Sequence, residues 1–217
     1  MKNLFLLTLL SFILLSACRK DQLTANGDIL TEIRTPGEFT TLHISGANRV
    51  KVSYGPGFMV ELKGSSNLMR YYKTDLVNKH LYLGYKNAGI MHDDMEIFIT
   101  LPLLHGVSLS GSANIAIEGD YPDMDELNLV ISGSGDISLN QELHVMQLNA
   151  GISGSGKLFL QKALIREADV DISGSGDIHL QVHDRLKVRI SGSGDVYYQG
   201  NPFIDSKISG SGKLIRF

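Results

Sequence analysis

The sequence has one cysteine, Cys18, and no tryptophan among its 217 residues. A single cysteine excludes an internal disulfide, and it leaves the seven scattered histidines without a thiolate partner for a structural zinc site. The chain also lacks a run of basic residues, and its formal net charge is −3. These absences argue against binding to nucleic acid and against electrostatic attachment to a membrane surface.

Glycine, in contrast, is abundant, and much of it belongs to a repeat. The motif Ile-Ser-Gly-Ser-Gly occurs five times in the C-terminal half, at spacings of 21, 20, 18 and 18 residues. A fixed period of this length is typical of a solenoid, in which each repeat is one coil stacked on the last. A sixth, imperfect copy begins at Leu109, and the five full copies begin at Ile131, Ile152, Ile172, Ile190 and Ile208.

Within each repeat the apolar residues follow a period of two. They stand four and two residues before the isoleucine and six and eight residues after it, with mostly polar residues between. Such alternation indicates half-buried strands. Glycine suits the bend between two strands because it reaches positive φ without a Cβ penalty. With a variable third side, a coil of 18–22 residues predicts an all-β fold, a single-stranded parallel β-helix.

Stacked coils place equivalent residues in columns. The position after Gly-Ser-Gly alternates between acidic and basic residues, and only Asp177 and Asp195 follow each other without a lysine between them. These two are the only candidate metal ligands of the column, for calcium, and solvated turn carboxylates are the simpler interpretation. We therefore predict no metal site and no cofactor. The column reads Asn114, Asp136, Lys157, Asp177, Asp195, Lys213.

The N-terminus has the pattern of a bacterial export signal over residues 1–17, with Lys2 followed by an apolar run. The run ends in Leu-Ser-Ala before Cys18, which resembles the lipobox of bacterial lipoproteins. That resemblance implies cleavage before Cys18 and a diacylglycerol on its sulfur. Residues 18–27 would then be the lipidated cysteine and a tether. Arg19 favours the outer membrane, facing either the periplasm or the exterior.

Residues 28–102 also alternate, over 29–33, 40–45, 49–53, 59–63, 80–85 and 96–101. Two interpretations remain open for this part. It continues the solenoid of residues 103–217 as degenerate coils, one of them matched weakly by the segment that begins at Leu62. Alternatively it is an antiparallel β cap with a short helix near residues 67–72. Either arrangement protects one end of the stack from edge-to-edge association.

Several segments together resemble the family described as putative auto-transporter adhesin, head GIN domain. They are Phe39-Thr-Thr-Leu-His-Ile-Ser-Gly, Val50-Lys-Val, Ile97-Phe-Ile-Thr-Leu-Pro and the Ser-Gly-Ser-Gly copies. The resemblance covers residues 38–217. It implies an exported β-helical domain of unestablished function, with no catalytic residues to carry over.

No catalytic motif stands out from the repeat. Gly-Ser-Gly leads into a strand, whereas a phosphate loop or a nucleophile elbow leads into a helix. The aspartates at 169, 171, 177 and 195 could form a carboxylate pair of the kind that glycosidases use, but outward strand positions are polar in any case. His179 and His183 are four residues apart, which places them on one face only in a helix. We predict no catalytic residues.

Binding is expected where the sequence departs from the repeat, over residues 197–202 and 87–94. Tyr197 and Tyr198 are adjacent on one strand, so one of them must point outward, where an aromatic ring could contact a sugar or a protein. His92, Asp93 and Asp94 lie in a predicted loop and are a weaker candidate site. Packing inside the domain is the more common role for tyrosines, including those at 71, 72, 82 and 85.

We therefore predict a non-enzymatic, lipid-anchored β-solenoid of the cell envelope that acts as a binding or adhesin-like module. Its partners would be the membrane, through the N-terminal lipid, and a glycan or an envelope protein. One alternative is a carbohydrate-active enzyme, a polysaccharide lyase or hydrolase, on a β-helix. Another is a structural envelope protein that self-associates as a homo-oligomer through its open coil edge.

Overall fold

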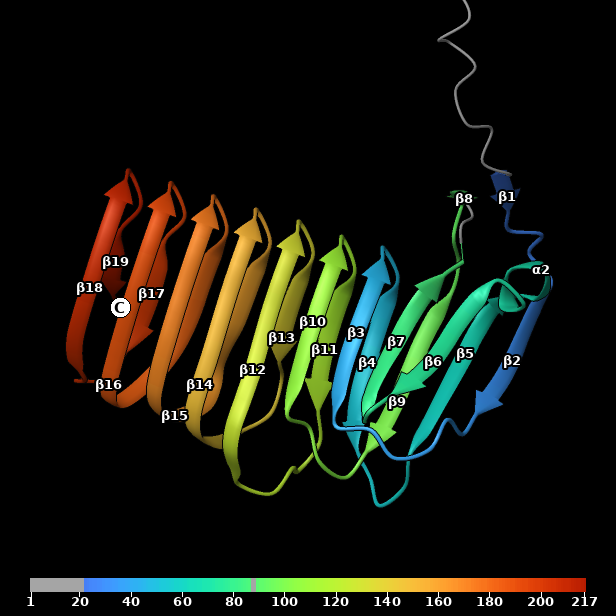
Figure 1. The fold of residues 1–217 in the computed structure, drawn as a ribbon, viewed down its shortest axis with the longest axis horizontal. Helices are drawn as coiled ribbons and strands as arrows, with labels where there is room; N and C mark the ends of the chain where they lie inside the picture. The colour runs from blue at the N-terminus through green and yellow to red at the C-terminus, as the bar shows by residue number, and fades with distance from the viewer. Residues whose placement is uncertain (1–21, 87–88) are drawn as a thin grey trace, which may run out of the picture.

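The computed structural model describes residues 22–86 and 89–217. About 70% of the chain is strand and 2% is helix, arranged as a parallel β-solenoid of about five turns with ~21 residues per coil (Figure 1). The predicted fold class is confirmed. The predicted export signal, Cys18 and Asn87 lie outside the described residues.

The strands of the N-terminal part are β1 (Gln22–Thr24), β2 (Ile29–Arg34), β3 (Thr41–Gly46), β4 (Arg49–Tyr54), β5 (Met59–Ser65), β6 (Tyr72–Val77), β7 (His80–Tyr85), β8 (Gly89–Met91) and β9 (Glu96–Leu101), with helix α2 (Ser66–Met69) between β5 and β6. The repeats contain β10 (Gly106–Gly111), β11 (Asn114–Glu118), β12 (Met124–Gly133), β13 (Asp136–Leu139), β14 (Leu143–Gly154), β15 (Lys157–Gly174), β16 (Asp177–Gly192), β17 (Val196–Gln199), β18 (Phe203–Gly210) and β19 (Leu214–Arg216).

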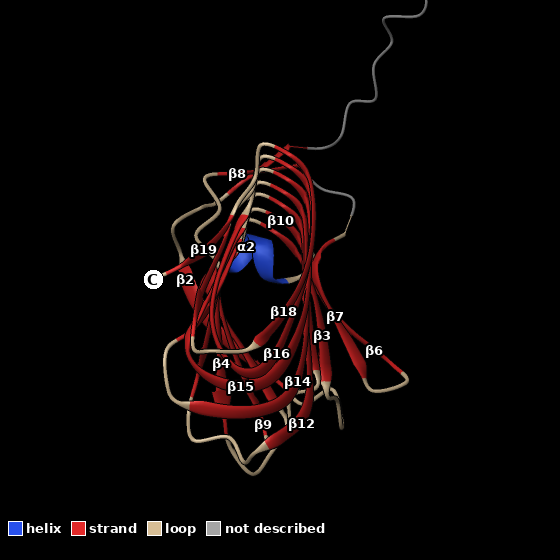
Figure 2. Cartoon of the chain, turned by 90° about the vertical axis from the view of Figure 1, so that its left-hand side faces the viewer, coloured by secondary structure: helices blue, strands red, loops and turns tan. Residues whose placement is uncertain are grey.

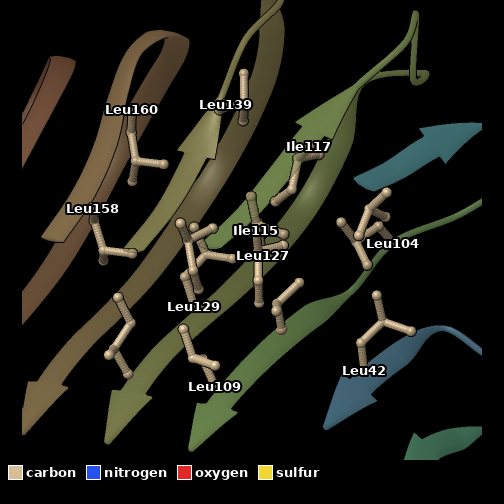
Figure 3. Packing of buried hydrophobic residues seen from close by; sticks show 14 of the residues in the cluster. Leu42, Leu104, Leu109, Ile115, Ile117, Leu127, Leu129, Leu139, Leu158 and Leu160 are labelled. Carbon is tan, nitrogen blue, oxygen red and sulfur yellow. The ribbon is translucent and has the colours of Figure 1, made fainter. Parts of the chain in front are cut away.

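Each coil follows the repeat in the predicted register. Ile131 pairs with Ile152, Ile152 with Ile172 and Ile172 with Ile190, all in parallel strands. These side chains are at most 2% exposed and form one column inside the coils. Burying an isoleucine stabilises a fold by about 1.5–3 kcal/mol, so the column is a major part of the core. Figure 3 shows leucines of neighbouring columns between the two sides of the stack.

The glycines of the motif permit the narrow bend at one edge of the coil (Figure 2). Gly174 has φ +133°, and a Cβ there would overlap the carbonyl oxygen of Gly154 in the coil before. The same oxygen accepts a hydrogen bond from the backbone N–H of Ser175 at 2.8 Å. Glycine is therefore required both by the backbone angle and by the close approach of successive coils.

The acidic and basic column after each bend links one coil to the next. The Asp136 carboxylate accepts a hydrogen bond from the N–H of Lys157 at 2.9 Å, and Asp195 accepts one from the N–H of Lys213 at 2.7 Å. The Lys157 ammonium lies 2.9 Å from Asp177, and this bond raises the pKa of Lys157. The alternation of sign thus gives attraction between coils where a column of aspartates would repel.

The N-terminal part combines the two predicted interpretations in an order that the sequence did not reveal. Strands β3 and β4 form a coil in parallel contact with β10 and β11. On its other side lie β7 and β9, also parallel, although they come later in the chain. The first coil in the chain, β3 and β4, is therefore the second coil of the stack counted from the cap. The outermost coil, β7 and β9, follows it in the chain, and β10 then packs on the other side of β3. Residues 28–102 therefore do contain coils, but the order of these coils in the stack differs from their order in the chain.

The outermost layer is an antiparallel cap. Strand β5 is antiparallel to β2 and β9, and β6 is antiparallel to β7. The weak coil match at Leu62 is therefore wrong, because Leu62 lies in an antiparallel strand that turns into α2. The predicted helix near residues 67–72 exists but is shorter, since Tyr72 already begins β6. Leu68 and Met69 of α2 are buried against the end of the core.

At the opposite end of the stack, no described part of the chain forms such a layer. Every residue of β18 is exposed, including the inward positions that are buried in the coils before it. Ile208 is 40% exposed, whereas Ile190, its partner in the preceding coil, is 2% exposed. Phe217 is 53% exposed and does not close the interior. Ile208, the last residue of the isoleucine column, therefore stands in the predicted register but is not buried.

Candidate functional site

The tyrosine pair of β17 points to opposite sides of its strand, as predicted. Tyr198 faces the interior and is 9% exposed, while Tyr197 lies on the outer surface. The Tyr197 ring stacks on His179 of the preceding coil, with ring centres 4.4 Å apart, and His179 stacks on Phe159. Because the rings stack along the solenoid axis, Tyr197 turns an edge toward solvent and has one face covered. A sugar ring would need a free face.

The candidate loop before β9 is bound into the fold. The Asp93 carboxylate accepts hydrogen bonds from the hydroxyl of Tyr85 and the amide of Asn48, both at 2.7 Å. Asp94 accepts the N–H of Ser65 at 2.9 Å and its hydroxyl at 2.6 Å. These bonds tie β9 to the cap and to the first coils. His92 is exposed, with φ +53°.

The structure does not bring the predicted site residues together. Tyr197 and Tyr198 lie near the open end of the stack, whereas the loop of His92, Asp93 and Asp94 lies at the capped end (Figure 1). Of the other tyrosines near the cap, Tyr72 is buried and Tyr71 and Tyr85 are half-buried, while Tyr82 is 43% exposed and stacks on His43 at 4.5 Å.

The two aspartates considered for calcium already accept bonds from the protein. Asp177 accepts the backbone N–H of Asp195 at 3.3 Å and pairs with Lys157. Asp195 accepts the N–H of Lys213 and, at 3.3 Å, the hydroxyl of Tyr197. Within residues 22–86 and 89–217, no group of three or more His, Cys, Asp or Glu side chains is arranged to hold a metal ion.

A groove of about 570 Å³ crosses the coils at the turn opposite the glycine bend. Its lining comes from three successive strands, β14, β15 and β16, with Asp123 and Gly200 at its ends. Val145, Ile165 and Val182 form a buried floor, since each is at most 2% exposed. The groove therefore runs along the solenoid axis, across several coils.

Apolar side chains also reach the surface of the groove. Met146 of β14 is 46% exposed, and Leu164 of β15, which pairs with His144, is half-buried. Both stand at outward positions, where the alternation would place a polar residue. Exposed apolar groups in a concave surface are characteristic of binding sites, and methionine adapts its shape to different partners.

The rim of the groove carries a fixed charged cluster. Both Asp184 oxygens are engaged, one with Nδ1 of His183 and the other with Nε of Arg166, each at 2.6 Å. The hydrogen bond from His183, and then that from Arg166, lowers the pKa of Asp184. The carboxylate is therefore ionised and paired, and it is poorly suited to act as a catalytic acid.

The sequence predicted binding at one residue of the groove, Gly200, which lies in the segment 197–202, and it gave no reason to select His183. The other lining residues were missed because they occupy the variable side of the coil, outside the repeated motif. One signal was available, namely that Met146 and Leu164 are apolar residues at polar positions.

Solved structures of similar fold come from Bacteroides and Parabacteroides species. A putative adhesin from Bacteroides fragilis is 18% identical, and the match covers 90% of this chain and 100% of that one, with a TM-score of 0.70. A putative adhesin from Parabacteroides merdae is 23% identical over 91% and 99% of the two chains, with a TM-score of 0.64. A putative lipid binding protein from Parabacteroides distasonis is 18% identical over 91% and 100%, with a TM-score of 0.61.

A search of curated proteins gives no match. In the part of the chain that the structure describes, no helix has the length and apolar character needed to cross a membrane. The family model for the putative auto-transporter adhesin, head GIN domain, matches residues 38–202, which is most of the sequence. The chain therefore belongs to this adhesin-like family, whose members are expected to be exported or surface proteins.

Proposed function

We propose that this protein is a non-enzymatic binding module of the cell envelope and that the groove across β14, β15 and β16 is its binding site. The observation that carries the proposal is the combination of exposed Met146 and half-buried Leu164 in a concave surface with a buried apolar floor. A rigid site loses little conformational entropy when a partner binds.

An extended segment of another envelope protein is the partner that suits this groove best. The groove follows the solenoid axis, so it fits a chain rather than a compact molecule. Met146 and Leu164 give the groove an apolar surface, which favours apolar side chains over the hydroxyl groups of a glycan. The ion pair of Arg166 with Asp184 at the rim, with His183 hydrogen-bonded to the same carboxylate, can orient polar backbone groups of the partner.

The experiment is site-specific photo-cross-linking in intact cells. A photoreactive residue at position 146 should yield one defined partner, and mass spectrometry should place the cross-link in a single segment of it. Val130 provides the control, because it is an outward apolar residue of β12, 43% exposed, outside the groove lining. Equal cross-linking at both positions would contradict a binding role for the groove.

A second arm separates a protein partner from a glycan. Leu164→Glu places a charge in the groove floor and should abolish cross-linking from position 146 while the circular dichroism spectrum stays unchanged. If this variant instead loses binding to an envelope polysaccharide, the partner is a glycan.

The alternative of a carbohydrate-active enzyme receives little support from the aspartates of this face. Asp171 is bound by the guanidinium of Arg189, and Asp169 lies 3.7 Å from the ammonium of Lys187. Each carboxylate is thus paired with a cation of the next coil rather than aimed at a second carboxylate. Turnover of a polysaccharide by the wild-type protein would favour the enzyme.

The same proposal includes a lipid anchor on Cys18, supported by the lipobox-like sequence before it. Cys18→Ala should move the protein from the membrane fraction to the soluble fraction of the envelope. A mature N-terminus other than a modified Cys18, found by mass spectrometry, would contradict the anchor.

A further inference from the structure

The open end of the solenoid exposes a complete strand edge together with core residues. All eight residues of β18 are exposed, and Phe203 at its start is 73% exposed. The inward positions Ile204 and Ile208 are 36% and 40% exposed, whereas Leu186 and Ile190, their partners in β16, are at most 2% exposed. These paired positions differ in exposure because β18 covers β16, whereas no strand of the described residues covers β18. An apolar edge of this kind is a template for strand pairing.

The capped end of a second copy does not supply the missing coil. There α2 closes the interior, with Leu68 fully buried. Arg34 extends across the cap and donates hydrogen bonds to the carbonyl oxygens of Met69 and Tyr72. Strand β6 also diverges from the stack (Figure 2). The surface that matches an open, apolar coil is therefore the same open coil on another molecule.

The sequence of β18 is complementary to itself in one antiparallel register. We propose that two copies pair through β18 about a two-fold axis that passes beside Ser206. Each Ile204 then faces Ile208 of the second copy on the inner side, and the two Ser206 residues face each other. On the outer side each Asp205 faces Lys207 of the second copy. Inner residues thus remain inner, and two ion pairs form by symmetry.

Register and charge support this arrangement independently. Ile204 and Ile208 belong to the inward columns of the solenoid, while Asp205 and Lys207 alternate with them on the outer face. Within the described chain neither Asp205 nor Lys207 forms an ion pair. A slip of one residue would place charged groups against the apolar interior, so the proposed register is strongly preferred.

Cysteine cross-linking tests the position of the axis. In an antiparallel pair, directly opposed Cβ atoms are about 5 Å apart, within reach of a disulfide. Ser206→Cys in the full-length chain should therefore form a covalent dimer under mild oxidation, whereas the wild-type chain, treated in the same way, should not. Ser209→Cys is the matched control on the same exposed strand. In the proposed register it lies about 20 Å from its counterpart and should remain monomeric on a non-reducing gel.

Three outcomes of this experiment would overturn the proposal. Equal cross-linking at the two positions would indicate random collision. No cross-link at Ser206→Cys, with the variant correctly folded, would exclude the axis. A molar mass above that of a dimer, found for the wild-type chain by light scattering, would indicate head-to-tail growth instead of closed pairing.

A charge exchange provides a second test that does not depend on disulfide chemistry. Asp205→Lys places like charges opposite each other twice in the dimer and should weaken the association by about tenfold or more, measured by analytical ultracentrifugation. Asp205→Lys combined with Lys207→Asp restores opposite charges and should restore association. If the double variant associates no better than the single variant, these residues do not face each other.

Discussion

The two ends of this solenoid are built from the same kind of coil and differ in what covers them. At the N-terminal end β2, β5, β6 and α2 form an antiparallel layer, and the coil residues beneath it, such as Leu81 and Ile97, are fully buried. At the C-terminal end no strand of the described residues covers β18 and β19, and Ile208 remains 40% exposed. Burial of a repeat position is thus decided by the next coil and not by the residue itself.

The largest expected effect comes from placing a charge in the isoleucine column at two depths. Ile172→Asp buries a carboxylate without a partner and should lower the free energy of unfolding by about 4 kcal/mol or more. Ile208→Asp, in the same column at the open end, should cost less than about 1 kcal/mol in the monomer. Urea denaturation of both variants measures the difference, and similar losses would show that the two ends are not distinct.

Substitution of a bend glycine should also cost more stability in the middle of the stack than at the open end, with smaller losses than in the isoleucine column. Gly174→Ala places a Cβ against the Gly154 carbonyl at positive φ, in the middle of the stack, and should cost about 3 kcal/mol. Gly210→Ala meets the Gly192 carbonyl in the same way. Its coil can move outward because no coil lies beyond it, so about half that loss is expected in thermal unfolding. A larger loss at Gly210 would be inconsistent with a free end.

The cap depends on hydrogen bonds that the open end lacks. Asp94→Ala removes the acceptor for both the N–H and the hydroxyl of Ser65, which is fully buried, and should cost about 2 kcal/mol. Asp94→Asn keeps an acceptor and should recover part of the loss. Asp28→Ala, which removes an exposed hydrogen bond from Ser66, should change stability by less than about 0.5 kcal/mol. Chemical denaturation compares the three variants.

The smallest expected effect is the contribution of His179, near the open end, to the pH dependence of stability. Burial between Phe159 and Tyr197 lowers the pKa of His179 below its ordinary value of 6.5. Below pH 6.5 the unfolded chain therefore binds a proton more readily than the folded chain, so stability falls as the pH falls. His179→Phe keeps the stacked ring and removes the titration. Its melting temperature should decline less than that of the wild type between pH 7.5 and about 5, and an identical decline would refute the assignment.

The repeat part of the fold could be predicted well from the sequence. The spacing of two fixed which side chains point inward, and the period of about twenty fixed which residues stack, as Ile131, Ile152 and Ile172 show. These features are local or repeat regularly, so a pattern reveals them. Tyr197 and Tyr198 illustrate the same rule, because adjacent residues of a strand must point to opposite sides.

The candidate site was harder to predict. The groove of Met146, Leu164 and Arg166 forms where three variable segments lie side by side, and no single segment carries a motif. Conversely, Asp93 and Asp94 looked available in a loop, but their oxygens are occupied by Tyr85, Asn48 and Ser65. Whether a polar group is free depends on partners distant in the sequence, 29 to 45 residues away for Ser65 and Asn48.

The sequence by itself determined the coil, its inward columns and its glycine bend, because each follows from backbone periodicity and from the space that a Cβ requires. Only the tertiary structure decided that β7 and β9 lie outside β3 and β4, and that β5 runs antiparallel. Strand alternation is the same in parallel and antiparallel pairs, so it carries no information about which neighbour a strand meets. That choice depends on the whole chain, and it leaves one end of the stack covered and the other open.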